Sequence, residues 1–327
     1  MNKILVTGGA GFIGSHVVDA VVARYPCAQI CVLDKLNYAA NINFIIDHLQ
    51  SRRVAFMAGD ITDYPAMLSA THGVDLVLNL AAESHVGRSF SNSMEFTRTN
   101  TLGTHVILEA SRQQNVARFI HVSTDEVYGE VLADGATEDH PLHPNNPYSG
   151  SKAAAEMIIQ SYWRSFGTNA IIVRANNIFG PRQFPEKIIP RFIMHAMDGK
   201  KLPLHGNGTH RRYYLAAQDF AAALLIIAES GELRTAYNVG TEEEYSNFAI
   251  AEMICRQTGR DPSTQIAFEA DRPFNDRRYA LNTARINSLG WSSRHRLAID
   301  LPDLVTWYRD NRHMFAQHFN TNTDLEE

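Results

Sequence analysis

A tyrosine and a lysine four residues apart, Tyr148 and Lys152, form the first pair in this chain suited to proton transfer. In a helix this spacing puts both side chains on one face. An ammonium near a phenol stabilises the phenolate, so Tyr148 is a candidate base for removing a hydroxyl proton. The same spacing also occurs in ordinary surface pairs, so its meaning depends on the surrounding sequence.

Two adjacent carboxylates, Asp125 and Glu126, are the more specific feature. They follow Thr124 directly after the strand predicted at 117–123. Neighbouring acids repel each other, which allows one to stay protonated while the other is ionised. Elimination of water needs such a pair, with a base for a C–H proton and an acid for the departing hydroxyl. A solvated acidic turn is the alternative interpretation.

A glycine-rich turn near the N-terminus indicates a dinucleotide site. Residues 3–7 predict a strand that runs into Gly8–Gly14 and then a helix. Glycines let the backbone approach a pyrophosphate, and the helix N-terminus presents N–H groups to it. Asp34 ends the second predicted strand, where its carboxylate suits ribose hydroxyls and would repel a 2′-phosphate. We therefore expect NAD rather than NADP, a preference that Lys35 weakens slightly.

The alternation of apolar runs and amphipathic stretches predicts βαβ units. We expect strands near 3–7, 29–33, 53–57, 75–80, 117–123 and 169–174 and helices near 12–24, 40–50, 64–70, 95–114 and 148–166. Continuous runs such as Ile4-Leu5-Val6 are typical of a parallel sheet that is buried on both faces. Right-handed crossovers then give an α/β fold with a doubly wound parallel Rossmann sheet.

The pattern changes beyond about residue 175, where prolines interrupt the chain and helices are expected near 217–230, 246–258 and 300–312. We expect an NAD-binding Rossmann domain over 1–175. The part over 176–320 is expected to be mainly a smaller C-terminal α/β substrate-binding lobe, with chain crossings between the lobes.

Composition excludes several classes of function. The 327 residues carry a net charge of −5 without a long block of either sign, which argues against a nucleic-acid or membrane-surface partner. No apolar run approaches the roughly 20 residues of a membrane span. The three cysteines lack Cys-x-x-Cys spacing and the 14 histidines lack metal-site spacing, so no disulfide framework and no metal is expected. No secretory signal is visible, and a reducing, cytoplasmic location is the expectation.

Four segments together resemble the extended short-chain dehydrogenase/reductase superfamily and, within it, the nucleotide-glucose 4,6-dehydratases that act on dTDP-glucose or UDP-glucose. The segments are Thr7–Gly14, Ala81–Val86, Ser123–Gly129 and Pro147–Lys152. The resemblance runs from residue 3 to about residue 310. The Thr-Asp-Glu triplet separates these dehydratases from related 4-epimerases and decarboxylases, which look alike around the glycines and the Tyr/Lys pair.

The resemblance implies an NAD-dependent hydro-lyase. Tyr148 would be the base at the sugar C4 hydroxyl, with Lys152 at the nicotinamide ribose and Thr124 at the C4 oxygen. Glu126 would then remove the C5 proton, while Asp125 donates a proton to the leaving C6 hydroxyl. The hydride taken from C4 returns to C6, so the product is a 4-keto-6-deoxy sugar nucleotide and NAD is not consumed.

The resemblance also implies which residues surround the two ligands. The cofactor would be held by Gly8, Gly11, Phe12, Ile13, Gly14, Asp34, Lys35, Asp60, Ile61, Ala81, Ala82 and Thr99, with Tyr148 and Lys152. The nucleotide sugar would be held by Ser84, His85, Asn177, Lys187, Arg212, Asn247, Arg272 and Asn275. Guanidinium groups suit a diphosphate, although each arginine taken alone fits a surface ion pair equally well.

Three positions depart from the family pattern. Gly87 stands where Asp is common, Tyr213-Tyr214 replaces a frequent Asp-Trp, and Asn275 replaces a His common in bacterial dTDP-glucose enzymes. The segment 273–276 is closer to the UDP-glucose dehydratases of rhamnose synthesis, so uracil and thymine both stay open.

Two other functions compete with the dehydratase interpretation. A 4-epimerase or decarboxylase of the same superfamily is the first alternative. An NAD-sensing regulator without chemistry is the second, but such proteins usually lose the Tyr/Lys pair. The segments 95–114 and 148–166 match helices that pair across the superfamily's dimer, so a homodimer is expected.

Overall fold

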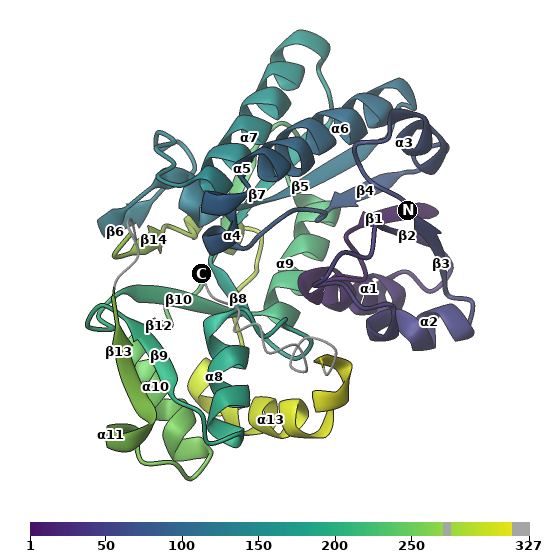
Figure 1. The fold of residues 1–327 in the computed structure, drawn as a ribbon. Helices are drawn as coiled ribbons and strands as arrows, with labels where there is room; N and C mark the ends of the chain where they lie inside the picture. Colours follow the sequence, from purple (N-terminus) through teal and green to yellow (C-terminus); the bar gives the residue numbers. More distant parts are fainter. Residues whose placement is uncertain (271–275, 316–327) are drawn as a thin grey trace.

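A computed structural model describes residues 1–270 and 276–315 of the chain (Figure 1). Its centre is a parallel sheet of seven strands in the order β11-β7-β5-β4-β1-β2-β3. The strands are β1 (Lys3–Thr7), β2 (Gln29–Asp34), β3 (Val54–Ala58), β4 (Leu76–Asn79), β5 (Arg118–Thr124), β7 (Ala170–Ala175) and β11 (Ala236–Val239). Six of them lie within one residue of the predicted strands, and β11 was not predicted.

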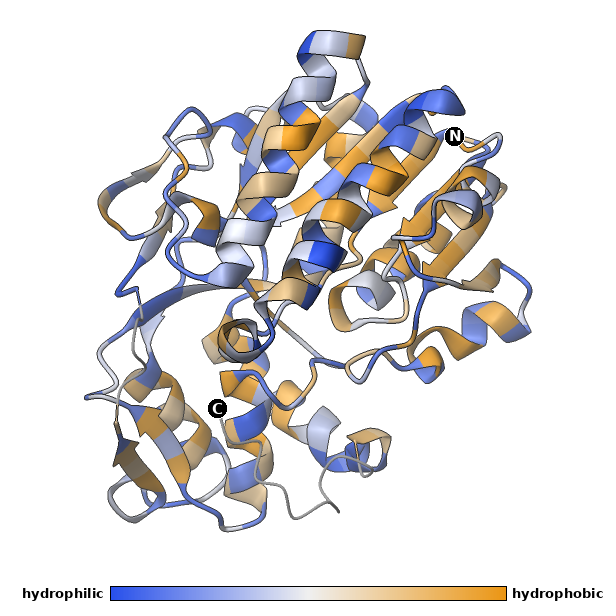
Figure 2. Ribbon diagram, turned by 45° about the horizontal axis from the view of Figure 1, so that its top comes forward, coloured by the Kyte–Doolittle hydropathy of each residue, from blue (hydrophilic) through white to orange (hydrophobic). Residues whose placement is uncertain are grey.

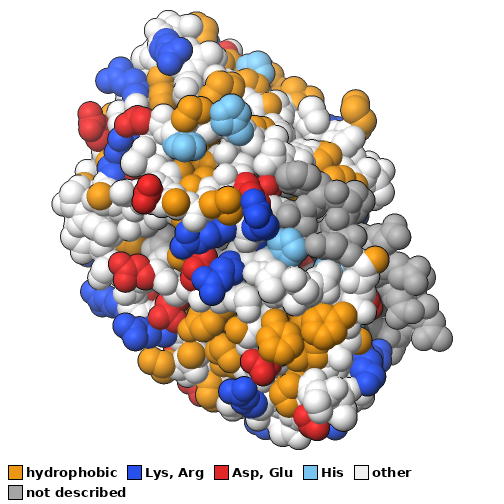
Figure 3. Space-filling view, turned by 90° about the vertical axis from the view of Figure 1, so that its left-hand side faces the viewer, with side chains coloured by type: hydrophobic (Ala, Val, Ile, Leu, Met, Phe, Trp, Pro, Cys, Tyr) orange, Lys and Arg blue, Asp and Glu red, His pale blue; other side chains and the backbone are white. Residues whose placement is uncertain are grey.

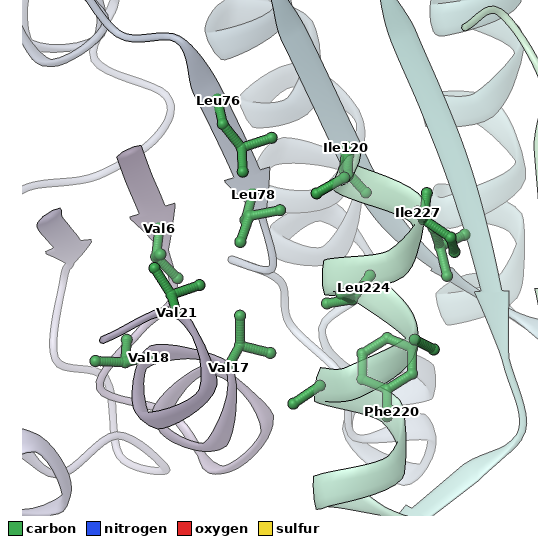
Figure 4. Packing of buried hydrophobic residues seen from close by; sticks show 14 of the residues in the cluster. Val6, Val17, Val18, Val21, Leu76, Leu78, Ile120, Phe220, Leu224 and Ile227 are labelled. Carbon is green, nitrogen blue, oxygen red and sulfur yellow. The ribbon is translucent and has the colours of Figure 1, made fainter. Parts of the chain in front are cut away.

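Helices cover both faces of this sheet, which confirms the doubly wound α/β fold. One face packs against α1 (Phe12–Arg24) and α9 (Ala217–Ser230), and the other packs against α3 (Tyr64–Ala70), α6 (Thr104–Gln113) and α7 (Pro147–Phe166). Neighbouring side chains of a strand therefore enter opposite cores: Val6 joins the core of α1 and α9, whereas Leu5 joins the other. Figure 4 shows the first core, where Val21 of α1 lies beside Val6 of β1 and Val17 is on the side of α1 that faces Leu224 of α9.

The order of the strands reverses between β1 and β4, so the crossovers run to opposite sides from this point. Ligands of open α/β sheets bind outside the carboxyl ends of the strands at such a switch point. The elements that begin or end there are therefore the ones that position a site: the turn after β1, the end of β5 and the start of α7.

A second group of elements lies beyond those strand ends (Figure 1). It contains three small sheets, formed by β8 (Asn177–Phe179), β10 (Arg211–Ala216) and β12 (Glu244–Ser246), by β9 (Leu202–His205) and β13 (Ile266–Glu269), and by β6 (Val131–Ala136) and β14 (Tyr279–Leu281). Its helices are α8 (Ile188–Met197), α10 (Asn247–Gln257) and α13 (Leu297–Asp310). They enclose a separate core that includes Phe192, Ile254 and Tyr308.

The chain passes between the two groups several times. Helix α9 and strand β11 follow residue 175 in sequence but pack with the large sheet, whereas β6 precedes it and pairs with β14. The hydropathy colouring in Figure 2 shows apolar residues concentrated in the central strands and on the inner faces of the helices. Among the described residues, no helix is both long and apolar enough to cross a membrane.

Shorter elements complete the described chain: α2 (Ile46–Gln50), α4 (Val86–Ser91), α5 (Ser93–Phe96), α11 (Pro262–Gln265), α12 (Ala284–Asn287), a π-helical segment (Thr97–Gly103) and 3-10 turns at Ile42–Ile45, Asp125–Tyr128 and Arg312–Phe315. The single helix predicted over 95–114 is thus interrupted by the π-helical segment. Gly103 ends this segment against Ile61, whose side chain would lie 2.6 Å from a Cβ at that glycine.

Figure 3 shows one side of the second group, where hydrophobic side chains gather on the lower part of the face. Phe248 and Phe268 are both exposed, and their rings stack with centroids 6.3 Å apart. Ion pairs occur on neighbouring strands and loops, including Arg211 and Arg278 with Glu244.

A buried ion pair joins α7 to β7. The guanidinium of Arg174 lies 2.6 Å from the carboxylate of Glu156, and the two side chains are 3% and 0% exposed. Arg174 also donates to the hydroxyl of Tyr128 and to the carbonyl of Glu138. Since a buried charge is tolerated only when it is paired, this contact fixes where α7 lies on the sheet.

The Glu156→Gln substitution should lower the free energy of unfolding by about 3 kcal/mol, because it leaves the buried Arg174 without a counter-charge. Urea unfolding would measure this change. Glu229→Gln is the matched control, since its partner Arg24 is 59% exposed and the substitution should leave stability almost unchanged. Equal effects of the two substitutions would contradict this account of the α7 contact.

Candidate active site

One cleft runs along the carboxyl ends of the central strands and separates them from the second group of elements. All of the predicted site residues that the structure describes line this cleft: Gly8, Gly11, Phe12, Ile13, Gly14, Asp34, Lys35, Asp60, Ile61, Ala81, Ala82, Ser84, His85, Thr99, Thr124, Asp125, Glu126, Tyr148, Lys152, Asn177, Lys187, Arg212 and Asn247. The predictions for Arg272 and Asn275 lie outside the described residues.

The glycine turn is packed so closely that larger residues do not fit. Gly8 has a φ of +69°, and a Cβ there would lie 2.8 Å from the backbone of Ala81. A Cβ at Gly14 would lie 2.0 Å from the carbonyl oxygen of Gly8. Helix α1 starts after Gly11 without a side-chain cap from the described residues, so its first N–H groups face the cleft. This cradle fits the pyrophosphate of a dinucleotide.

Asp34 ends β2 at the ribose side of this cradle. Its carboxylate accepts hydrogen bonds from the backbone N–H groups of Ala10 (3.0 Å) and Leu36 (2.8 Å). Burial raises the pKa of Asp34, and these two hydrogen bonds oppose that effect. The Lys35 ammonium is 3.4 Å from the carboxylate of Glu95. The positive charge of Lys35 is therefore balanced locally by Glu95.

Further along the cleft, the predicted residues are held by their neighbours. Asp60 accepts hydrogen bonds from the backbone N–H and the hydroxyl of Thr62, both at 2.9 Å. Thr99 is buried and donates to Glu95 at 3.2 Å. Glu95 thus contacts both Thr99 and Lys35 at this end of the cleft.

Asp125 is buried directly after β5. One of its oxygens accepts from the amide of Asn176 at 2.9 Å, and the other accepts from the hydroxyl of Thr124 at 3.2 Å. Burial, together with the neighbouring charge of Glu126, raises the pKa of Asp125 to about 7, although the hydrogen bonds from Asn176 and Thr124 oppose the rise. This carboxyl group can therefore hold a proton near neutral pH and donate it.

Glu126 has different surroundings. It is partly accessible from the cleft, and its carboxylate accepts from the amide of Asn146 at 3.1 Å. Burial raises its pKa, whereas the hydrogen bond from Asn146 and the positive charges of Arg212 and Lys187 oppose the rise. Two adjacent carboxyl groups with unlike environments are what an acid and a base in one elimination require.

Tyr148 and Lys152 face the cleft from the first turns of α7. Asn146 caps this helix by accepting from the backbone N–H of Ser149 at 2.8 Å, while the Ser149 hydroxyl accepts from the Asn146 N–H in return. Pro147 occupies the first helical position, where its missing N–H costs nothing. The local sequence therefore fixes the start of α7 and, with it, the height of Tyr148 above the strand ends.

The pKa of Tyr148 differs in direction from the sequence-based expectation. Burial and the negative charge of Glu126 raise it, and a hydrogen bond with Thr124 opposes the rise. The Lys152 ammonium donates to the carbonyl of Val122 at 2.6 Å. Burial lowers the pKa of Lys152 to about 8.

The substrate side of the cleft contains contacts between segments that are distant in sequence. Lys187 donates to the carbonyl of Ser84 at 2.7 Å and so connects the two walls. His85 begins α4 by accepting from the backbone N–H of Arg88 at 3.1 Å. The guanidinium of Arg212 lies over the ring of Tyr279 with its carbon 4.7 Å from the ring centroid. Lys187 and Arg212 give this wall positive charge.

Two residues that hold the acid pair are not among the site residues predicted from the sequence. Asn176 holds Asp125, and Asn146 holds Glu126. The Asn146-Pro147 dipeptide before a helix is a sequence signal for a cap, and it would have placed Asn146 beside Tyr148. No sequence signal identifies Asn176 as the partner of Asp125, because the contact joins separate strands. Among the described residues, no cluster of three or more His, Cys, Asp or Glu side chains is arranged to hold a metal ion.

The sequence pattern of the family described as GDP-mannose 4,6 dehydratase matches residues 5–299. A trifunctional UDP-glucose 4,6-dehydratase/UDP-4-keto-6-deoxy-D-glucose 3,5-epimerase/UDP-4-keto-L-rhamnose-reductase of Arabidopsis thaliana is 45% identical over 316 residues, which are 95% of this chain and 47% of that protein. This chain therefore spans about half the length of the plant relatives that it matches. The dTDP-D-glucose 4,6-dehydratase of Mus musculus is 40% identical over 319 residues, which cover 95% of this chain and 90% of that protein.

Two solved structures are similar over nearly the whole chain. The dTDP-glucose 4,6-dehydratase of Streptomyces venezuelae, with NAD and TYD bound, has a TM-score of 0.94 and 37% identity, covering 96% of this chain and 99% of that one. The UDP-glucose 4-epimerase of Thermus thermophilus, in complex with NAD, has a TM-score of 0.86 and 28% identity, covering 94% and 99%. From the matched pattern and the identity to these relatives, the chain belongs to the GDP-mannose 4,6 dehydratase family.

Proposed function

We propose that this protein is an NAD-dependent nucleotide-sugar 4,6-dehydratase that converts UDP-glucose or dTDP-glucose to the 4-keto-6-deoxy sugar nucleotide. The observation that carries the proposal is the pair of adjacent carboxyl groups with unlike surroundings, Asp125 and Glu126, in the cleft that Tyr148 also lines. One carboxyl group that can donate a proton, one that can accept a proton and a phenol in the same cleft are the groups that the oxidation and the elimination of water need.

In this reaction Tyr148 takes the proton of the C4 hydroxyl, and Thr124 holds the C4 oxygen through the hydroxyl that also contacts the phenol. NAD supplies the hydride acceptor for C4 and the hydride donor for C6. The cradle after β1 and the carboxylate of Asp34 bind it, and Lys152 binds its nicotinamide ribose. Burial of these groups excludes water from the reacting carbon atoms.

The two carboxyl groups divide the elimination between them. The C4 ketone acidifies the C5 proton, which Glu126 removes because Lys187 and Arg212 favour its ionised form. Asp125 donates its proton to the C6 hydroxyl, which leaves as water, and Glu126 returns its proton to C5 when the hydride is returned to C6. The raised pKa of Asp125, about 7, supports this direction of transfer. The proposed roles of Asp125 and Glu126 thus follow from the surroundings of each carboxyl group and not from the order of the two residues in the chain.

Lys187 and Arg212 contact the diphosphate of the substrate, and Ser84, His85, Asn177 and Asn247 contact its sugar and nucleoside. The positive charges of Lys187 and Arg212, on the wall opposite the glycine turn, support placing the diphosphate of the substrate there. Arg272 and Asn275 remain proposals from the sequence. The names of the plant relatives support UDP-glucose and a place in rhamnose synthesis, whereas the animal and bacterial relatives carry the name of dTDP-glucose.

We also propose that the functional division of the chain lies near residue 175. The part over 1–175 binds NAD, and the part over 176–320 mainly binds the nucleotide sugar, while α9 and β11 return to support the NAD-binding sheet. Strand β10 and helix α10 support this division, since they supply Arg212 and Asn247 to the substrate wall.

A second copy of the chain is the proposed partner of the face formed by α5, the π-helical segment and α7. These elements pack against one another and expose large apolar side chains, namely Met94, Leu102 and Met157. Water contact with such side chains is unfavourable, and a symmetric pairing of two helical faces removes it.

Incubation with UDP-glucose and with dTDP-glucose tests the proposed reaction by mass spectrometry of the product. We expect a product lighter by one water, with one nucleotide used faster than the other. Tyr148→Phe should lower the rate by about 100-fold or more, since the base is lost, while NAD binding persists. A product of unchanged mass would instead indicate an epimerase.

Solvent deuterium separates the roles of the two carboxyl groups. In deuterated water, Asp125→Asn should still exchange the C5 proton of the sugar while it forms water slowly, because the base is retained. Glu126→Gln should lose both the exchange and the elimination. Equal C5 exchange in the two variants would contradict the assignment of Glu126 as the base.

Light scattering tests the proposed dimer. The wild-type chain should scatter as a particle of twice the chain mass. The double variant Leu102→Glu/Met157→Glu should scatter as a monomer, because it places four charges in the symmetric contact. Phe268→Glu, which changes an exposed apolar residue of β13, is the control and should leave the dimer intact.

A further inference from the structure

The ammonium of Lys35, the residue that follows Asp34 at the end of β2, lies among three carboxylates from different parts of the chain. Its nitrogen is 3.4 Å from an oxygen of Glu95 on α5, 3.5 Å from one of Glu83 after β4 and 3.9 Å from one of Asp60 after β3. Lys35, Asp60 and Glu83 line the cleft together with Asp34, whereas Glu95 is not part of its lining. The positive charge of this lysine is therefore directed at carboxylates of the protein itself.

Other contacts hold these carboxylates in place. The side chain of Glu83 is only 9% exposed, and one of its oxygens accepts from the amide of Asn37 at 3.2 Å. Glu95 accepts from the hydroxyl of Thr99 at 3.2 Å through the oxygen that faces Lys35. The guanidinium of Arg98 is 3.7 Å from the other oxygen of Glu95, but it is 60% exposed and its charge is screened by water. The acids are thus fixed, and the flexible lysine is held between them.

The charge at this end of the cleft is unfavourable for a further anion. Asp34 and the three carboxylates around Lys35 outnumber the single positive charge of that lysine. A phosphate on the 2′-oxygen of an adenosine ribose would add roughly two negative charges. In other dinucleotide sites a basic side chain near the ribose accommodates this phosphate. Lys35 is a basic residue in such a position, but carboxylates already surround its ammonium.

We propose that Glu95, together with Asp60 and Glu83, determines the cofactor specificity of this cleft by holding the ammonium of Lys35 away from a 2′-phosphate. The inference rests on the proposed placement of NAD with its adenosine ribose at Asp34. It goes beyond that placement, because it makes Lys35 a phosphate-binding group that the neighbouring acids keep out of use. Exclusion of NADP then depends on these acids as well as on Asp34.

Glu95→Gln is the substitution that tests this inference, because it removes the charge and keeps an oxygen that accepts from Thr99. Since Glu95 is not part of the cleft lining, its effect on a dinucleotide passes through Lys35. Lys35→Met, alone and combined with Glu95→Gln, completes a double-mutant cycle. Glu109→Gln is the matched control, since Glu109 also pairs with an arginine three residues later, Arg112, and is not part of the cleft lining.

The measurement is the binding of NADH and of NADPH, followed by nicotinamide fluorescence, to the chain after removal of bound nucleotide. The wild-type chain should bind NADH more tightly than NADPH. Glu95→Gln should raise the affinity for NADPH relative to NADH by about five-fold or more, because the released ammonium can reach the phosphate. Lys35→Met should lower this ratio much more in the Glu95→Gln background than in the wild-type chain, and Glu109→Gln should leave it unchanged.

An unchanged ratio in Glu95→Gln would overturn the proposal, and so would an equal gain in Glu109→Gln. Equal effects of Lys35→Met in the two backgrounds would also overturn it, because Glu95 and Lys35 would then act as independent charges. A wild-type chain that binds neither NADH nor NADPH would instead contradict the proposed cofactor site, and the inference would fail with it. Tight binding of NADH without any response to Glu95→Gln would contradict the inference alone.

Discussion

The burial of two adjacent carboxyl groups at the end of β5 is the constraint on which the rest of the cleft depends. Removing an ionised carboxylate from water is costly unless donors replace the lost water or the group keeps its proton. Asp125 and Glu126 meet this requirement in different ways, since the first has a pKa of about 7 and the second has positive charges nearby. Their unequal ionisation is therefore a consequence of burial and of where the donors lie.

The donors that satisfy these groups also hold the elements together. Asn146 caps α7 and donates to Glu126, so the start of the helix that carries Tyr148 cannot shift without disturbing the acid pair. Asn176 joins the end of β7 to Asp125 in the same way. Both amides are fixed by backbone groups at their other ends, Ser149 and Thr241. A site built in this way is organised before substrate binds, which lowers the energy needed to reach the transition state.

Much of this arrangement could be predicted from local sequence, because local chemistry determines it. The apolar runs predict six strands of the large sheet. The backbone of Gly8 packs closely against Ala81, so only glycine fits there, and this is why the glycine turn in the sequence indicates a dinucleotide site. Strand β11 was missed because it has only four residues, one of them the polar Asn238, which is too few for periodicity to separate it from a loop. The direction of the Tyr148 pKa was also missed, since it depends on how deeply the phenol is buried and on the distance to Glu126, neither of which is encoded in spacing.

The similarity to a UDP-glucose 4-epimerase, with a TM-score of 0.86 at 28% identity, shows how little of the chemistry the fold itself determines. The large sheet, the glycine cradle and the Tyr/Lys pair are sufficient to bind a dinucleotide and to move a proton at a hydroxyl, and many reactions share these steps. An elimination needs two more groups, one that gains a proton and one that loses a proton within the same cleft. In the proposed function Asp125 and Glu126 provide them, and the amides of Asn176 and Asn146 donate hydrogen bonds to these two carboxyl groups. On that proposal, a few hydrogen bonds at the end of one strand distinguish an elimination from the other reactions of this fold.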